Sequence, residues 1–317
     1  MILHTQIPLK KQQLHQINYN SKLLLLGSCF SENIGNKLAY YKFQSAVNPF
    51  GILFQPKAIE TLITNAINQK KYSDEDIFFH NERWHNFEAH SSLSSTDKNE
   101  ITNNLNTANT ATLNYLKNST HIVITLGTSW VYRHIETDTI VANCHKIPQK
   151  KFLKEILSVE EITESLEAII ALIKTTNNKV SIIFTVSPVR HLKDGFIENQ
   201  RSKAHLLSAI HQIIEPQNNT HYFPSYEIMM DELRDYRFYA EDMIHPNKTA
   251  IDYIWERFSE VWLSEETQQT MKDVATIQKG LTHRSFNPTS EAHLKFLKNL
   301  QQKKETLEKA FPFMKFL

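Results

Sequence analysis

Residues 22–41 read KLLLLGSCFSENIGNKLAYY, and this stretch decides the fold. The apolar run KLLLL at residues 22–26 predicts a short buried strand. The residues from Gly27 onward predict a turn that opens a helix, with Ser28 directly at the turn. A buried strand that passes at once into a helix is the first unit of an alternating α/β chain.

The same alternation continues along the chain. Further strands are predicted at residues 43–47, 121–126 and 180–186, with a weaker one at 221–226. Helices are predicted at residues 56–67, 160–175 and 199–214, and a buried helix face recurs over 251–262. Strands that alternate with helices of this length indicate a parallel sheet with helices on both faces.

Two regions depart from this alternation. Residues 72–120 are first rich in aromatic residues and histidine and then in Ser, Thr and Asn, which predicts an insertion that supplies pocket walls. The tail from Ser264 is rich in Lys and Glu with spaced apolar residues, which predicts one or two surface helices. We therefore expect an α/β domain over residues 1–263 and a helical extension over 264–317, which either packs on that domain or forms a homodimer contact.

The composition excludes several classes of protein. The 317 residues include 35 Lys+Arg and 34 Asp+Glu, so no basic excess is present to bind nucleic acid or an anionic membrane by charge. No apolar run approaches the ~20 residues that span a bilayer. The start of the sequence carries no secretion signal. With only two cysteines, Cys29 and Cys144, neither a disulfide framework nor a CxxC zinc site is expected.

Two common phosphate-binding loops, GxGxxG and GxxxxGK[ST], are also missing, which argues against dinucleotide enzymes and P-loop NTPases. The sequence accordingly predicts a cytoplasmic protein with no membrane span, no nucleic-acid partner, and no requirement for a cofactor or metal.

Ligands of open α/β sheets bind beyond the carboxyl ends of the strands, so the residues that follow each predicted strand are the candidates for a site. A serine hydroxyl becomes a nucleophile when an imidazole accepts its proton and a carboxylate orients that imidazole. Ser28 follows the first strand, and Asp242 and His245, three residues apart before Pro246, follow the fifth. We predict that Ser28 attacks an acyl carbonyl, His245 moves the proton and Asp242 orients His245.

Several stretches resemble the GSCFA-domain family, a branch of the SGNH (GDSL-type) hydrolase superfamily. They are GSCFSENIG, VNPFGILFQP, ITLGTSWVYR, VANCHKIP, TVSPVRHLKDGFIENQRSKAHL and YAEDMIHPN, which together span about residues 20–250. The resemblance implies a flavodoxin-like three-layer α/β/α fold with a five-stranded parallel sheet. It also implies a serine ester hydrolase or acyltransferase that acts on a small-molecule acyl ester.

Carried over residue by residue, the family's serine falls on Ser28 and the DxxH pair on Asp242 and His245. The superfamily's glycine after the second strand falls on Gly51. The backbone N–H groups of Ser28 and Gly51 are expected to bind the oxyanion.

One block departs from the superfamily pattern. The GxND block, whose asparagine binds the oxyanion, reads GTSW at residues 127–130, so Ser129 replaces that asparagine. Asn48 and Asn143 are two other sources of the missing amide. Since losing one oxyanion donor costs on the order of 10²–10³ in turnover, the change implies slow hydrolysis, a different reaction or none. A catalytically inactive protein that binds a ligand or partner is therefore the alternative.

Other readings of these residues stay open. Ser28 alone is also a common helix N-cap, and Cys29 is a rival nucleophile. The group Arg190, His191 and Lys203 either binds an anionic part of the substrate or is solvated and ion-paired. The histidines at positions 80, 85 and 90 allow a metal site, although their spacing does not put them on one helix face.

Overall fold

A five-stranded parallel sheet forms the centre of the protein, whose computed structural model describes residues 5–316. The strands are β1 (Lys22–Gly27), β2 (Gln44–Val47), β5 (His121–Leu126), β9 (Ser181–Val186) and β10 (Thr220–Tyr222). They lie in the order β2-β1-β5-β9-β10, which is 2-1-3-4-5 in order of appearance and matches the flavodoxin-like arrangement. The predicted fold class is confirmed.

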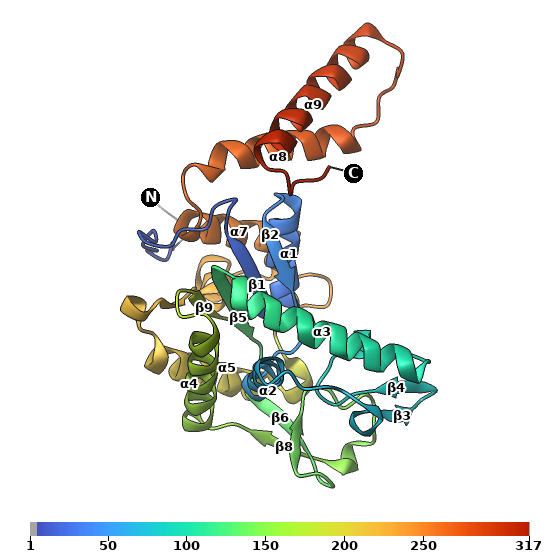
Figure 1. The fold of residues 1–317 in the computed structure, drawn as a ribbon. Helices are drawn as coiled ribbons and strands as arrows, with labels where there is room; N and C mark the ends of the chain where they lie inside the picture. The colour runs from blue at the N-terminus through green and yellow to red at the C-terminus, as the bar shows by residue number, and fades with distance from the viewer. Residues whose placement is uncertain (1–4, 317) are drawn as a thin grey trace.

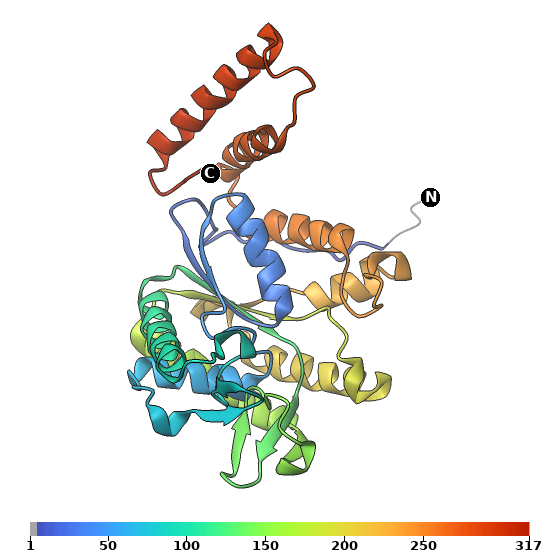
Figure 2. The same ribbon diagram turned by 90° about the vertical axis from the view of Figure 1, so that its right-hand side faces the viewer.

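Helices cover both faces of the sheet and make the three layers visible in Figures 1 and 2. One face carries α2 (Pro56–Ile67), α3 (Lys98–Asn118), α4 (Val159–Thr176) and α5 (Phe196–Ile213); the other carries α1 (Cys29–Tyr40) and α7 (Lys248–Trp262). The short α6 (Ser225–Glu227) follows β10, and its Tyr226 packs with the first of these faces.

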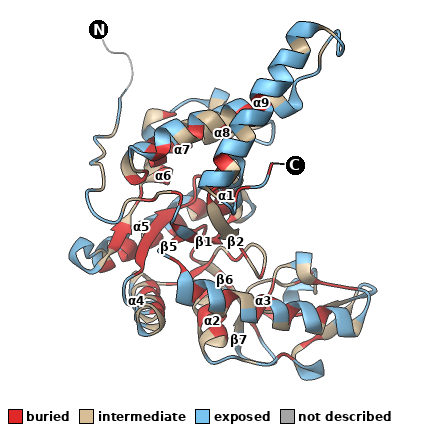
Figure 3. Cartoon of the chain, turned by 45° about the horizontal axis from the view of Figure 1, so that its top comes forward, coloured by how far each residue is buried: buried red, intermediate tan, exposed pale blue. Residues whose placement is uncertain are grey.

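The inner strands β1, β5 and β9 are buried between these layers, whereas the edge strand β2 is only partly buried (Figure 3). Successive side chains of a strand point to opposite faces, so Leu24 and Leu26 pack with α2–α5 while Leu23 and Leu25 pack with α1 and α7.

Two small antiparallel sheets extend the α/β layers. Within the predicted insertion, β3 (Phe78–His80) pairs with β4 (Arg83–His85). The second half of the insertion is α3, which packs on α2 as one of the helices that cover the sheet. A second sheet that the sequence did not predict consists of β6 (Trp130–His134), β7 (Thr139–Val141) and β8 (Phe152–Ile156) in the order β7-β6-β8.

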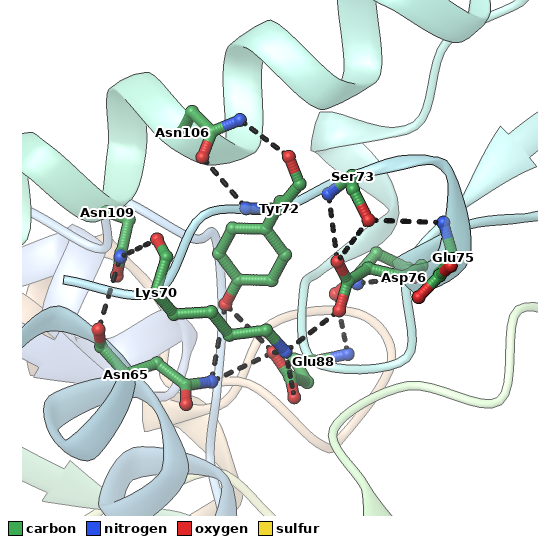
Figure 4. Close-up of polar contacts among 10 residues, drawn as sticks. Asn65, Lys70, Tyr72, Ser73, Glu75, Asp76, Glu88, Asn106 and Asn109 are labelled. Atoms are coloured by element: carbon green, nitrogen blue, oxygen red, sulfur yellow. Dashed lines mark hydrogen bonds and ion pairs between the residues drawn. The ribbon is translucent and has the colours of Figure 1, made fainter. Parts of the chain in front are cut away.

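A half-buried polar network fastens the first of these regions to its neighbours (Figure 4). Lys70 Nζ lies 3.1 Å from the Glu88 carboxylate, which also accepts hydrogen bonds from the Tyr72 hydroxyl (2.8 Å) and the Asn65 amide (2.9 Å). The Asn106 side chain of α3 exchanges two hydrogen bonds with the backbone of Tyr72. Burial, and then the Glu88 carboxylate, raise the pKa of Tyr72, so its hydroxyl remains a donor. The network therefore ties α2, the connecting loop and α3 together.

The helical extension consists of α8 (Thr267–Thr282) and α9 (Glu291–Ala310), which pack on each other and on the side of α1 and α7 (Figures 1 and 2). Gly280 allows their close approach, because a Cβ there would lie 2.5 Å from a methyl carbon of Leu300. The domain boundary at 263/264 and a homodimer through these helices both stay predictions. Within residues 5–316, no helix is long and apolar enough to cross a membrane.

Candidate active site

The turn after β1 holds Ser28 at the start of α1. Gly27 has φ +129°, and a Cβ on it would lie 2.1 Å from the carbonyl oxygen of Thr125, so only glycine fits here. Ser28 N–H donates to that same oxygen (3.0 Å), and its Oγ accepts a hydrogen bond from Phe30 N–H (3.2 Å) as the N-cap of α1. The hydroxyl thus lies at the positive end of a helix, but Ser28 is only 1% exposed.

Asp242 and His245 form a hydrogen-bonded pair in the loop before α7. Asp242 Oδ2 accepts from His245 Nδ1 at 2.7 Å, while its Oδ1 accepts the backbone N–H groups of Ile244 (2.9 Å) and His245 (3.0 Å). These bonds, the backbone one from His245 first, lower the pKa of Asp242 to about 2. The carboxylate is therefore ionised at neutral pH. The carboxylate holds Nδ1 of His245, whereas Nε2 of the same ring makes no hydrogen bond within residues 5–316.

Backbone contacts hold this loop against the end of β9. Arg190 N–H donates to the carbonyl of Ile244 (3.2 Å), and Ala240 N–H donates to that of His245 (2.7 Å). The neighbouring His191 has its pKa lowered to about 3, first by burial and then by its electrostatic interactions with Lys203 and His245. The bond from Arg190 to Ile244 therefore places the His245 loop at the carboxyl end of β9.

The ends of the other strands meet at this same edge of the sheet. Gly127, after β5, donates its N–H to the carbonyl of Phe54 (2.7 Å), and a Cβ on it would lie 2.9 Å from His191 Nε2. The rings of Phe54 and His191 are in contact, with their centres 5.4 Å apart and their planes tilted by 41°. Lys203 Nζ donates to the carbonyls of Gly127 and Ser187, each at 2.7 Å. The loop after β2 and the ends of β5 and β9 are thus joined through direct contacts.

Ser28 and His245 share this edge without touching. Lys203 and His191 are packed at the same strand ends, Lys203 through its bonds to Gly127 and Ser187 and His191 against the ring of Phe54. Among the described residues, however, no hydrogen bond joins the hydroxyl of Ser28 to the ring of His245. Of the three residues of the predicted triad, Asp242 and His245 are hydrogen-bonded to each other, and Ser28 is bonded to neither.

Of the residues predicted to bind the oxyanion, Asn48 is the one that contacts the Ser28 turn. Its Oδ1 accepts a hydrogen bond from Gly27 N–H (2.9 Å), and its Nδ2 is buried with no partner among residues 5–316. Asn48 has φ +44°, a left-handed conformation that asparagine adopts more readily than most residues. A buried amide donor without a partner is costly, which makes it a candidate for a ligand contact.

The other oxyanion candidates have partners elsewhere. The N–H groups of Ser28 and Gly51 donate to the carbonyls of Thr125 (3.0 Å) and Asn48 (2.7 Å). Ser129 is 0% exposed and bonded to Ser202 of α5 through both its N–H (2.7 Å) and its hydroxyl (3.3 Å). Asn143 Oδ1 accepts from His145 N–H (2.8 Å) in the loop after β7. Their roles in oxyanion binding stay predictions.

The structure also shows the environments of Cys29, the rival nucleophile, and of the histidine-rich segment. Burial raises the pKa of the Cys29 thiol, which disfavours the thiolate. Both cysteines are free. His85 is hydrogen-bonded through Nδ1 to Ser94 Oγ (2.7 Å) and through Nε2 to the carbonyl of His80 (3.0 Å). Within residues 5–316, no group of three His, Cys, Asp or Glu side chains is arranged to hold a metal ion.

Fold and site together define a flavodoxin-like α/β protein with a serine, a histidine and an aspartate at the carboxyl edge of its sheet. The model of the GSCFA family matches residues 22–258, and the model described as the GSCFA domain protein, C-terminal domain, matches residues 274–317. The chain therefore belongs to the GSCFA family. No curated protein matches it.

The Asp242–His245 pair leads to a first prediction. In the triad predicted from the sequence, replacing Asp242 by asparagine removes the charge that would stabilise the imidazolium, so we expect the predicted ester turnover to fall by about 10²–10⁴. Steady-state kinetics with an activated ester measures the loss. Glu241→Gln removes a neighbouring exposed carboxylate and should leave turnover unchanged. Equal rates for Asp242→Asn and wild type would contradict a role for this pair.

Proposed function

We propose that this GSCFA protein is a serine-dependent ester hydrolase or acyltransferase of the SGNH type. The observation that carries the proposal is the Asp242–His245 pair, in which Nδ1 is held at 2.7 Å by an ionised carboxylate. It lies at the same edge of the sheet as Ser28 at the start of α1. A serine and an oriented imidazole at one strand edge suit nucleophilic acyl transfer.

In the proposed reaction, Ser28 Oγ attacks the carbonyl carbon of an acyl ester while His245 Nε2 takes its proton. The tetrahedral intermediate collapses, and His245 returns the proton to the departing alcohol. His245 then takes a proton from water or a second alcohol, which attacks the acyl-serine, and returns that proton to Ser28 Oγ as the carboxylic acid or new ester is released. The free Nδ2 of Asn48 and the N-terminus of α1 are the groups proposed to bind the oxyanion.

This reaction requires a local rearrangement. Ser28 Oγ must leave its bond to Phe30 N–H and become accessible to substrate, since the residue is 1% exposed. The side chain of His245 is 48% exposed on a loop and is the group able to move towards it. Catalytic hydrogen bonds in unliganded sites are often long and tighten only in the substrate complex.

A fluorophosphonate probe tests the proposal directly. Wild-type protein should become covalently labelled at Ser28, as peptide mass spectrometry would identify, and Ser28→Ala should not be labelled. Cys29→Ser separates the two candidate nucleophiles, because it should still be labelled if Ser28 is the reactive group. Labelling at another residue, or none at all, would contradict the proposal.

A second candidate function is a catalytically inactive member of the same fold that binds a ligand or a protein partner. It is favoured by the burial of Ser28, the lack of a hydrogen bond to His245 among described residues, and Ser129 in place of the oxyanion asparagine. In this case no ester or thioester in a broad panel would be hydrolysed. A small molecule that raises the melting temperature would then identify the ligand.

A further inference from the structure

A lysine is buried at the edge of the sheet where the candidate site lies. Lys203 of α5 is 1% exposed, although lysine is almost never fully buried unless it is paired. Its Nζ donates two hydrogen bonds of 2.7 Å, to the carbonyl of Gly127 after β5 and to that of Ser187 after β9. No salt bridge to Lys203 is formed within residues 5–316. The ammonium group therefore holds two strand ends without a carboxylate to neutralise it.

Three different elements face this ammonium group. The Tyr226 ring centre lies 5.6 Å from Nζ, and Cys29 of α1 and His191 after β9 are the titratable groups whose interaction with the lysine shifts a pKa. An ammonium carries three donors, and two of them are used by carbonyls. Burial lowers the pKa of Lys203 to about 7, so its charge responds to pH near neutrality.

Lys203 and Ser28 are both hydrogen-bonded to backbone carbonyls at the end of β5. Gly27 pairs with Thr125, and Ser28 donates to the carbonyl of Thr125. Lys203 binds the carbonyl two residues further along the same strand end, at Gly127. The ammonium group and the Ser28 turn are therefore both bound to the carboxyl end of β5.

We propose that Lys203 is a positioning residue that fixes the ends of β5 and β9 and places a positive charge beside the Gly27–Cys29 turn. This inference rests on the proposed function: the charge stabilises the oxyanion that forms when Ser28 attacks. It would compensate for the superfamily's oxyanion asparagine, which is replaced by Ser129 in this sequence. The substrate class is an ester whose transition state gains a negative charge at this edge.

The first part of the test uses Cys29 as a reporter and does not depend on catalysis. In a Cys144→Ser background the rate of alkylation of Cys29 by iodoacetamide is measured from pH 6 to 10. A nearby cation favours the thiolate, so Lys203→Met should slow alkylation at neutral pH by about threefold to tenfold. Lys174→Met is the matched control, because Lys174 donates to the carbonyl of Val180 just before β9, at the opposite end of the sheet, and should change nothing.

Lys203→Arg keeps a charge at all pH values and guards against a folding defect in Lys203→Met. Its alkylation profile should lose the inflection near pH 7 that wild type shows as Lys203 loses its proton. An unchanged profile in both variants, with melting temperatures that show folded protein, would overturn the location of the charge.

The second part measures the rate of phosphonylation of Ser28. Lys203→Met should lower it by about 10²–10³, and Lys203→Arg should retain more of it than Lys203→Met. If wild type is labelled and Lys203→Met reacts at the same rate, the role proposed for Lys203 is overturned. If wild type is not labelled while Cys29 responds to Lys203, the proposed function fails and the charge beside the turn is supported.

Discussion

Replacing Ser28 by alanine is expected to abolish ester turnover, with a loss in kcat/KM of at least about 10⁴. The proposed reaction forms its covalent bond at Ser28 Oγ, and burial raises the pKa of the neighbouring Cys29 thiol, which disfavours Cys29 as a substitute nucleophile. In serine hydrolases the loss of a triad residue leaves only the rate enhancement from substrate binding and the oxyanion site. Steady-state hydrolysis of an activated ester by purified variant and wild type measures the loss.

Folding is expected to survive this change. Ser28 caps α1 by accepting from Phe30 N–H, and loss of an N-cap costs about 1 kcal/mol. Ser31→Ala is the matched control, because Ser31 is equally buried, lies in the same helix and donates to the carbonyl of Leu26 (3.1 Å). It should retain turnover. Activity that persists in Ser28→Ala at the level of Ser31→Ala would exclude Ser28 as the nucleophile.

Replacing Gly27 by alanine is expected to destabilise the protein by more than about 4 kcal/mol, the range of severe core mutations. The added Cβ would lie 2.1 Å from Thr125 O and 2.8 Å from Thr125 C, which are backbone atoms of the neighbouring central strand. Neither strand can shift without disturbing the pairing of β1 with β5. Chemical denaturation of the variant measures the free energy of unfolding.

Gly195→Ala separates the cost of the backbone conformation from the cost of the clash. Gly195 also has positive φ, at +108°, but a Cβ there would meet the end of the Glu198 side chain, which can move. This control should cost only about 1–2 kcal/mol. Similar losses for both variants would mean that the approach of Gly27 to Thr125 is not what specifies glycine at the turn.

Much of the sheet could be predicted because its strands are short continuous apolar runs. The run at residues 121–126 coincides with β5, and KLLLL covers all but the last residue of β1. The β6–β8 sheet was missed because its strands are partly exposed; Leu153 of β8, for example, is 51% exposed. Such strands lack the apolar run that indicates a buried strand.

Part of the candidate site could likewise be predicted from the sequence, and part could not. The three-residue spacing of Asp242 and His245 predicts their contact, since both lie in one turn, and the structure has that hydrogen bond. The burial of Lys203 has no local signal, because its two carbonyl partners lie 76 and 16 residues away in the sequence. A lysine on α5 reads as solvated until the helix is packed against the strand ends. Whether Ser28 reaches His245 depends on rearrangement of a loop and is equally beyond sequence patterns.

The most direct test of the account is the distance from Ser28 Oγ to His245 Nε2 in a crystal structure of the protein treated with a fluorophosphonate. The account predicts a covalent adduct on Ser28, with the imidazole nitrogen about 3 Å from Oγ and Asp242 still bound to Nδ1. An unmodified Ser28, or an adduct with His245 turned away and out of hydrogen-bonding reach, would contradict it.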